Sequence, residues 1–334
     1  MKKALATILK YVIFLGLGIG VAWYMLYKVQ KDGNLDKLLD SIHKSISPPW
    51  YLITICFVGF LSHYIRAIRW RYLLETIDLR PTLTNTMFAV MIGYITNLVL
   101  PRAGEVAKCT VLAKYEGMPA HKMVGTIVAE RAFDVVCLLS IAIGTFLLEM
   151  GRINSYISKF ILPYMKGLEK VLITGLVIFA IALVLIMLWY RKNKESKIGQ
   201  LVKEMTHGIL SIVHMKKKWE FLVLSILMWL MYTLQIYLGL KSVGANLSII
   251  SSMVVLVWGS VALIFVPGGI GLYPWLVSQM LQGPYQVDMI TSDAFGWIAW
   301  AVQTVVVIVL GVCSLLLIHS YNKKRNAQIT VDTK

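Results

Sequence analysis

Residues 83–101 read LTNTMFAVMIGYITNLVLP, an apolar run that ends at a proline. Residues 249–267 read IISSMVVLVWGSVALIFVP and have the same form. Proline has no backbone N–H and ends a helix, so each run is predicted to be the first limb of a broken helix. One fixed offset aligns the two runs and places Met87 over Met253, Gly93 over Gly259 and Pro101 over Pro267.

The composition of the chain excludes an ordinary soluble domain. Of its 334 residues, 58% are hydrophobic and 15% are charged, and a soluble fold would have to expose large apolar patches. We therefore predict an all-α integral membrane protein with about six full spans plus two re-entrant broken-helix hairpins. The full spans are expected near residues 11–27, 51–65, 122–149, 171–190, 221–240 and 294–318.

The basic loops predict the orientation. Residues 191–218 hold eight Lys or Arg against two Glu, which favours a cytoplasmic loop, with both termini on the same side. If both proline-terminated runs crossed the membrane fully, this loop would lie opposite the N-terminus. The charge rule thus favours re-entrant hairpins at about 82–120 and 249–282, and an inner-membrane protein whose basic side faces anionic lipid.

This count divides the chain into two similar halves. Residues 1–150 and 151–320 each contain three full crossings and one hairpin, so the second half must be inverted relative to the first. Residues 321–334 are predicted to be a basic cytoplasmic tail. Inverted repeats with matching interrupted helices are typical of transporters whose site lies near the midplane. A chance similarity between two short apolar runs is the alternative.

Between its two end residues, the predicted span 122–149 contains three charged residues, namely Glu130, Arg131 and Asp134. A charge at that depth costs roughly 3 kcal/mol or more, so such residues are normally paired or functional. Their spacing predicts one broad helical face on which Arg131 bridges one or both carboxylates, completed by Arg102 and Glu105. The network is either structural or part of a lipid site.

The two hairpin tips differ in chemistry. The first tip holds Arg102, Gly104 and Glu105, and a helix that restarts there would point N–H groups at a phosphate beside the Arg102 guanidinium. The second tip, Pro267, Gly268, Gly269 and Gly271, offers backbone that a lipid headgroup can approach closely. Both tips are candidate substrate-binding segments.

The span near residues 51–65 ends in a cationic segment. Arg66 and Arg69 recur at helical spacing, and Arg66 is a candidate for headgroup contacts at a cytoplasmic entrance. Trp70 and Arg71 are expected to anchor the helix at the membrane interface.

The sequence predicts neither a metal nor a cofactor. The four cysteines, Cys56, Cys109, Cys137 and Cys313, are scattered singly with no ligand spacing, and no nucleotide-binding motif is present. No basic stretch has the aromatic-rich soluble surroundings typical of nucleic-acid binding. Membrane lipids with anionic headgroups are the predicted partners.

Four ordered motifs resemble a known family. They are Arg66-x-x-Arg69-Trp70, Leu100-Pro-Arg-Ala-Gly-Glu105, Glu130-Arg-x-x-Asp134 and Pro267-Gly-Gly-Ile-Gly271. Together they are similar to the flippase-like transmembrane domain of the lysylphosphatidylglycerol synthetase family, over roughly residues 8–320. The resemblance implies a protein that moves, or helps to deliver, an amphipathic lipid between leaflets. Cargoes proposed for relatives include aminoacylated phospholipids, polyprenyl-linked glycans and hopanoids.

Two departures from the family pattern affect the function. Relatives that make aminoacyl lipids carry a soluble synthase domain, and this sequence is expected to lack synthase activity. Relatives also often place an acid after the second glycine-rich tip, where Leu272, Tyr273 and Pro274 stand here. That departure weakens any mechanism that needs a carboxylate in both hairpins.

Three functions are compatible with these observations. Lipid translocation is favoured by the repeat, the broken hairpins and the intramembrane charges. A non-catalytic scaffold that delivers lipid to a synthase or glycosyltransferase partner is the alternative. An enzyme is disfavoured, because no metal or nucleophile motif is present and the arginine would hold the neighbouring carboxylates ionised.

Overall fold

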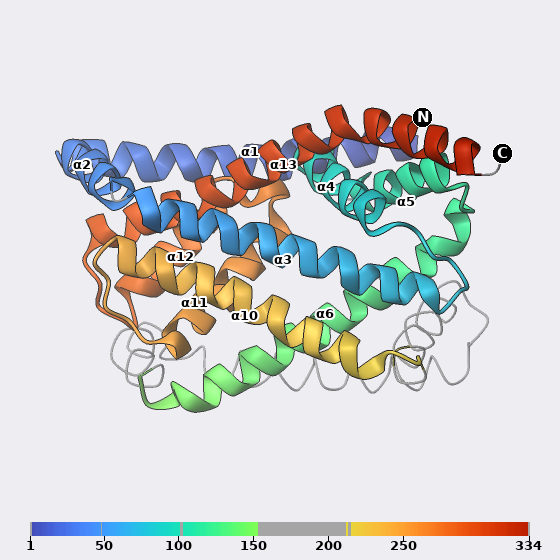
Figure 1. Cartoon of the computed structure of the whole chain (residues 1–334). Helices are drawn as coiled ribbons and strands as arrows, with labels where there is room; N and C mark the ends of the chain where they lie inside the picture. The colour runs from blue at the N-terminus through green and yellow to red at the C-terminus, as the bar shows by residue number, and fades with distance from the viewer. Residues whose placement is uncertain (1, 48, 101–102, 153–211, 213–214, 333–334) are drawn as a thin grey trace, which may run out of the picture.

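The computed structural model describes residues 2–47, 49–100, 103–152, 212 and 215–332, and the regular elements in this part of the chain are all helices (Figure 1). In chain order they are α1 (Lys2–Lys31), α2 (Leu35–Ile46), α3 (Pro49–Glu75), α4 (Leu83–Val99), α5 (Ala103–Glu116), α6 (Ala120–Leu148), α10 (Lys218–Ser242), α11 (Ile249–Phe265), the short 3₁₀ helix η3 (Pro267–Gly269), α12 (Leu272–Gln282) and α13 (Met289–Asp332).

Four helices are long and apolar enough to cross a membrane: α3, α6, α10 and α13. They cover four of the six predicted spans. The predicted span at 11–27 lies within the 30-residue helix α1, which is not among those four, and the one at 171–190 lies outside the described residues. The all-helical membrane class is therefore confirmed, while the number of spans stays a prediction.

The first predicted hairpin consists of two helices in contact, α4 and α5. A Cβ atom built on Gly104 would lie 2.1 Å from the carbonyl oxygen of Gly93, so the limbs meet where neither residue has a side chain. The Thr82 side chain caps α4 by accepting a hydrogen bond from the Asn85 N–H. The glycine pair thus sets how closely the hairpin closes.

The second predicted hairpin has the same plan. Helix α11 has 17 residues, as α4 does, and its cap, Ser248, accepts from the Ser251 N–H. Helix α12 folds back on α11, where a Cβ on Gly259 would lie 2.6 Å from the Tyr273 ring. Both glycines that the sequence alignment paired are therefore points of close approach between two limbs.

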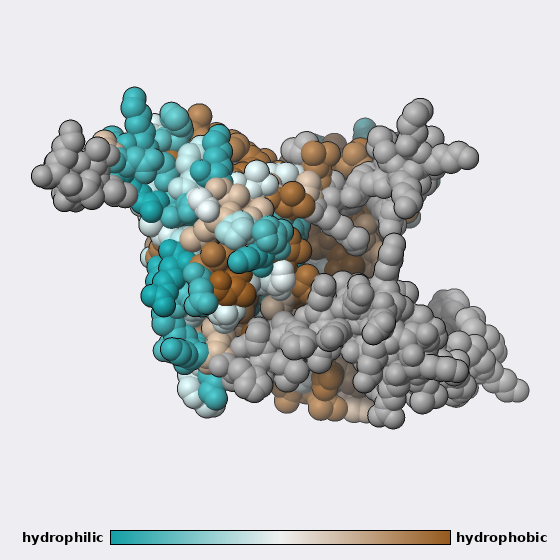
Figure 2. Space-filling view, turned by 90° about the vertical axis from the view of Figure 1, so that its right-hand side faces the viewer, coloured by the Kyte–Doolittle hydropathy of each residue, from teal (hydrophilic) through white to brown (hydrophobic). Residues whose placement is uncertain are grey.

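The two hairpins lie at opposite ends of the molecule. Figure 1 shows α4 and α5 toward the end where both termini lie, and α11 and α12 toward the other end. The tips come together, because α4 contacts η3. Figure 2 views the end with the termini, where hydrophilic residues gather along one side of the described surface.

Apolar side chains cover much of the outer surface of the spans. Val135, Leu139 and Ile143 on α6 and Leu316 on α13 are exposed, as is expected where the surrounding medium is lipid. Inside, one apolar cluster, which includes Trp70, Leu74 and Leu112, packs the first half. A second cluster, which includes Leu240, Val255, Tyr273 and Phe295, packs the second half.

One expectation about the helix ends was wrong. Trp70 is fully buried and donates its indole N–H to the Thr126 hydroxyl at 3.1 Å, so it is not an interfacial anchor. Most of the predicted basic tail continues α13 as helix to Asp332, and its cytoplasmic location stays a prediction. Arg325 pairs there with Glu116 at 3.0 Å, and these tertiary contacts keep the helix running past its apolar stretch.

Candidate functional site

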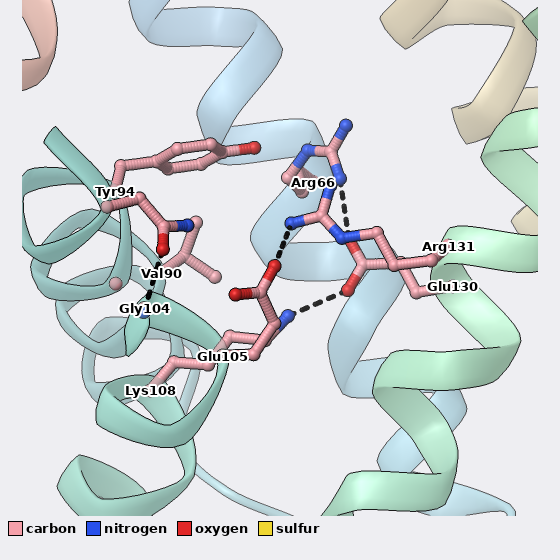
Figure 3. Close-up of a pocket in the computed structure, with 10 residues that line it drawn as sticks. Arg66, Val90, Tyr94, Gly104, Glu105, Lys108, Glu130 and Arg131 are labelled. Carbon is pink, nitrogen blue, oxygen red and sulfur yellow. Dashed lines mark hydrogen bonds and ion pairs between the residues drawn. The ribbon is translucent and has the colours of Figure 1, made fainter. Parts of the chain in front are cut away.

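The charged residues of three helices meet at one buried centre. Arg66 and Arg69 come from α3, Lys108 from α5, and Glu130 and Asp134 from α6. Figure 3 shows three of them, Arg66, Lys108 and Glu130. Arginines three apart on α3 and carboxylates four apart on α6 each lie on one helical face, so two facing helices bring them together. We call these five residues the ionic cluster.

Glu130 is the centre of the cluster. Its side chain is fully buried, and one carboxylate oxygen accepts from Arg66 Nη1 at 2.7 Å while the other accepts from Lys108 Nζ at 2.8 Å. Arg69 Nη2 lies 3.7 Å from the first oxygen. A buried carboxylate needs such partners, since a charge removed from water without them is strongly unfavourable.

Asp134 links the two arginines of α3. It accepts from Arg66 Nη1 at 3.0 Å and from Arg69 Nη2. Arg69 also donates to the Ser225 hydroxyl at 3.3 Å, and Arg66 donates to the Tyr232 hydroxyl at 3.2 Å, both on α10. The cluster therefore connects α3, α5, α6 and α10.

Arg131 does not join Glu130 and Asp134 as predicted. Its guanidinium pairs with Glu105 on α5 at 2.9 Å, and both side chains are partly exposed, at 44% and 28%. Successive residues of an α-helix are rotated by about 100° around its axis. Arg131 therefore does not lie on the buried face that Glu130 and Asp134 share. The predicted contact with Glu105 is present, and the predicted bridge to the α6 carboxylates was wrong.

A small cavity lies between the hairpin and α6. Arg66, Tyr94, Asn97, Glu105 and Lys108 are among the residues that line it, together with Glu130 and Arg131 (Figure 3). Its volume of about 10 Å³ admits about one water molecule. Asn97 accepts from the Gly104 N–H at 2.8 Å, which occupies a backbone donor at the start of α5.

The cavity and the cluster hold polar atoms without partners. Arg66 Nε, Arg69 Nε and Glu105 Oε2 are buried and make no hydrogen bond among the described residues. Four cations, Arg66, Arg69, Lys108 and Arg131, face three carboxylates, Glu105, Glu130 and Asp134, which leaves one formal positive charge. This balance suits an anion or water as a further partner.

The glycines of the second tip lie away from the lining of this cavity. Gly268, Gly269 and Gly271 have positive φ values of 64°, 68° and 68°, which favour glycine. A Cβ on Gly271 would lie 2.1 Å from the Gly18 carbonyl oxygen of α1, and Trp300 donates to the Gly268 carbonyl at 2.8 Å. These contacts with α1 and α13 give the glycines a packing role.

Arg102 lies outside the described residues, as does Pro101, and for Pro267 the description covers the backbone alone. Of the remaining predicted residues, the structure brings together Arg66, Arg69, Glu105, Glu130, Arg131 and Asp134, with Gly104 in the cavity wall.

Sequence reasoning missed Lys108, Tyr94 and Asn97. Lys108 had a signal, because it stands one helical turn after Glu105 in a segment predicted to lie in the membrane. Tyr94 and Asn97 are polar positions in an apolar run, and Tyr232 had no signal of any kind. No group of three or more metal-ligating side chains occurs in the described part of the chain.

Comparison with known proteins places this arrangement in a family. Residues 7–311 match the family described as the lysylphosphatidylglycerol synthase TM region. A UPF0104 membrane protein of Methanocaldococcus jannaschii is 22% identical over 267 residues, covering 71% of this chain and 75% of that protein. No solved structure matches the chain. Because the family match spans most of the sequence, the chain belongs to the lysylphosphatidylglycerol synthase transmembrane-region family.

Proposed function

We propose that this protein translocates a lipid with an anionic headgroup between the leaflets of a cell's inner membrane. The ionic cluster and the small cavity beside it are the proposed headgroup site. The observation that carries the proposal is the buried, partly unpartnered set of cations at the junction of a broken hairpin and a span. Charges kept at that depth are typical of a substrate pathway.

The proposed scaffold is a pair of inverted repeats. If 166 is added to each residue number, the first and last residues of α4 become those of α11. The same shift pairs Thr82 with Ser248 and Glu116 with Gln282. Matching contacts support the pairing: α4 touches α13, and α11 touches α6. In such proteins one repeat rocks against the other around a fixed site.

The cavity has room for about one water molecule and is too small for a lipid headgroup. In the proposal, this conformation is therefore the closed state. A headgroup phosphate would replace carboxylates as the partner of Arg66 or Lys108, and planar guanidinium groups bind phosphate well. Glu130 and Asp134 then balance the cations when the phosphate leaves. The basic loops favour a cytoplasmic location for the termini and for the open end of the first hairpin in this scheme.

A leaflet-exchange assay in vesicles tests the function. The whole chain is reconstituted with fluorescent phosphatidylglycerol, and Arg66→Gln is compared with the matched control Arg71→Gln, also on α3 but paired with Glu75 outside the cluster. We expect Arg66→Gln to slow exchange at least tenfold, since a charge-assisted contact is worth roughly 1.5–3 kcal/mol, and Arg71→Gln to match wild type.

Equal rates for both variants would remove the cluster from the mechanism. If the wild-type protein exchanges no lipid while a synthase or glycosyltransferase co-purifies with it, the scaffold function replaces this one.

A further inference from the structure

A second, much larger cavity lies beside the first, between α5 and α6. Its volume is about 660 Å³, and most of its lining is apolar, including Val106, Val124, Ile127, Val128 and Val135. Exposed positions such as Val106 and Val124, 68% and 53% exposed, place this cavity at the outer surface of the helices. We call it the α5–α6 groove.

Two residues line both cavities. Glu105 and Arg131 belong to the wall of the small polar cavity and to the wall of the α5–α6 groove. They are joined by the 2.9 Å ion pair, which therefore stands between an apolar groove and a polar centre.

Resting on the proposed function, we propose that the α5–α6 groove binds an acyl chain of an anionic phospholipid and that the Glu105–Arg131 pair is the gate through which its phosphate reaches the ionic cluster. The occupant follows from the chemistry of the walls. An apolar groove on a membrane helix pair faces lipid tails, and Arg131 is the one Lys or Arg among the described residues that line it. A tail in the groove places its own phosphate near that guanidinium.

The gate works by exchange of one anion for another. Arg131 has one carboxylate partner, Glu105, whose second oxygen is buried without a hydrogen bond. A phosphate that binds Arg131 releases Glu105, which opens the wall toward Arg66 and Lys108. Exposed ion pairs contribute little to stability, so a stronger bidentate contact with phosphate can displace this partly exposed pair.

Photocrosslinking of the whole reconstituted chain tests the groove. A benzophenone amino acid replaces Val124 in the groove or Leu316, 71% exposed on α13, as the control for general lipid contact. The vesicles contain equal amounts of phosphatidylglycerol and phosphatidylcholine, and mass spectrometry identifies the attached lipid. We expect phosphatidylglycerol to be enriched about tenfold at position 124 relative to position 316, as one charge-assisted contact allows.

Two further substitutions, combined with the position-124 probe, separate a gate from a structural pair. Arg131→Gln should reduce the enrichment to the level at position 316, whereas Glu105→Gln should raise it, because the competing carboxylate is gone. A purely structural pair would move both variants in the same direction. Equal enrichment at positions 124 and 316, or a loss in Glu105→Gln, overturns the inference.

This experiment can fail separately from the proposed function. Arg66→Gln should slow lipid exchange at least tenfold while the enrichment at position 124 persists. Lipid exchange without enrichment in the groove would refute the groove alone, and enrichment without exchange would refute translocation alone.

Discussion

The two junctions between a hairpin and the helix that follows it connect corresponding helices, but different kinds of contact hold them together. In the first half, α5 meets α6 through Lys108 and Glu130 at 2.8 Å. In the second half, the positions at the same offset are Pro274 and Gly296, and a Cβ on Gly296 would lie 2.6 Å from the Pro274 carbonyl oxygen. One junction is joined by charge and the other by direct backbone contact.

This difference suggests which junction can move. Ion pairs beside a cavity can exchange one partner for another, whereas a close-packed contact loses its dispersion energy as soon as it opens. Both cavities described above lie at the first junction. We therefore expect the first hairpin to rearrange during the proposed lipid transport and the second to stay fixed against α1 and α13.

The largest expected effect comes from removing the centre of the charged junction. Glu130→Gln leaves Lys108 without its buried counter-charge and Arg66 with Asp134 alone, and breaking a buried pair costs about 3–5 kcal/mol. Thermal unfolding in detergent should show a marked loss of stability. Glu149→Gln, which removes an ion pair with Arg152 at the end of α6, is the control and should change stability little. Similar unfolding temperatures for the two variants would mean that the cluster does not hold the first junction together.

An added side-chain atom in the close-packed junction should lower the free energy of unfolding. Gly296→Ala adds a Cβ against the Pro274 backbone, and overpacking of this kind costs about 1–3 kcal/mol. Gly125→Ala on α6 is the matched control, since a Cβ there meets nothing within 4 Å. Unfolding measured for both variants checks the contrast, and a stable Gly296→Ala would show that the second junction is loose.

A smaller effect is expected at the second tip. Trp300→Phe removes the hydrogen bond to the Gly268 carbonyl, a loss of about 0.5–1.5 kcal/mol. Hydrogen exchange of the tip amides should rise in this variant, while exchange at the first tip should not. Faster exchange at both tips would indicate that the two hairpins are coupled rather than separately held.

The smallest expected effect is a pH dependence of stability, which comes from the end of the first hairpin opposite its tip. Burial raises the pKa of Glu116, but hydrogen bonds from Thr82, Asn85 and Arg325 outweigh it and hold that pKa below its ordinary value. The stability from these contacts is therefore present at neutral pH and is lost as the pH falls through the ordinary carboxylate range toward the lowered pKa. Gln282 occupies the matching place in the second hairpin and cannot titrate.

Glu116→Gln should flatten the dependence of unfolding temperature on pH in the acidic range. Glu220→Gln, at an exposed position on α10, is the control and should retain the wild-type profile. Identical profiles for wild type and Glu116→Gln would remove this carboxylate as the source of the dependence.

Much of the site was predictable because charges in an apolar segment are conspicuous. The sequence singled out Arg66, Arg69, Glu130 and Asp134, and the structure joins them directly. It could not show that Arg131 pairs with Glu105 and not with Glu130 or Asp134, because nearness on a helix does not decide which residue of a neighbouring helix is closest. Lys108 was missed for the same reason.

The sequence by itself determined the membrane class and the breaks in the two hairpins. These features depend on composition and on proline geometry, which are local properties. Only the tertiary structure decided that Glu130 has three cationic neighbours and that the tip glycines face α1. It also decided that Glu105 and Arg131 separate two cavities, since partners between helices are set by packing of segments far apart in the chain.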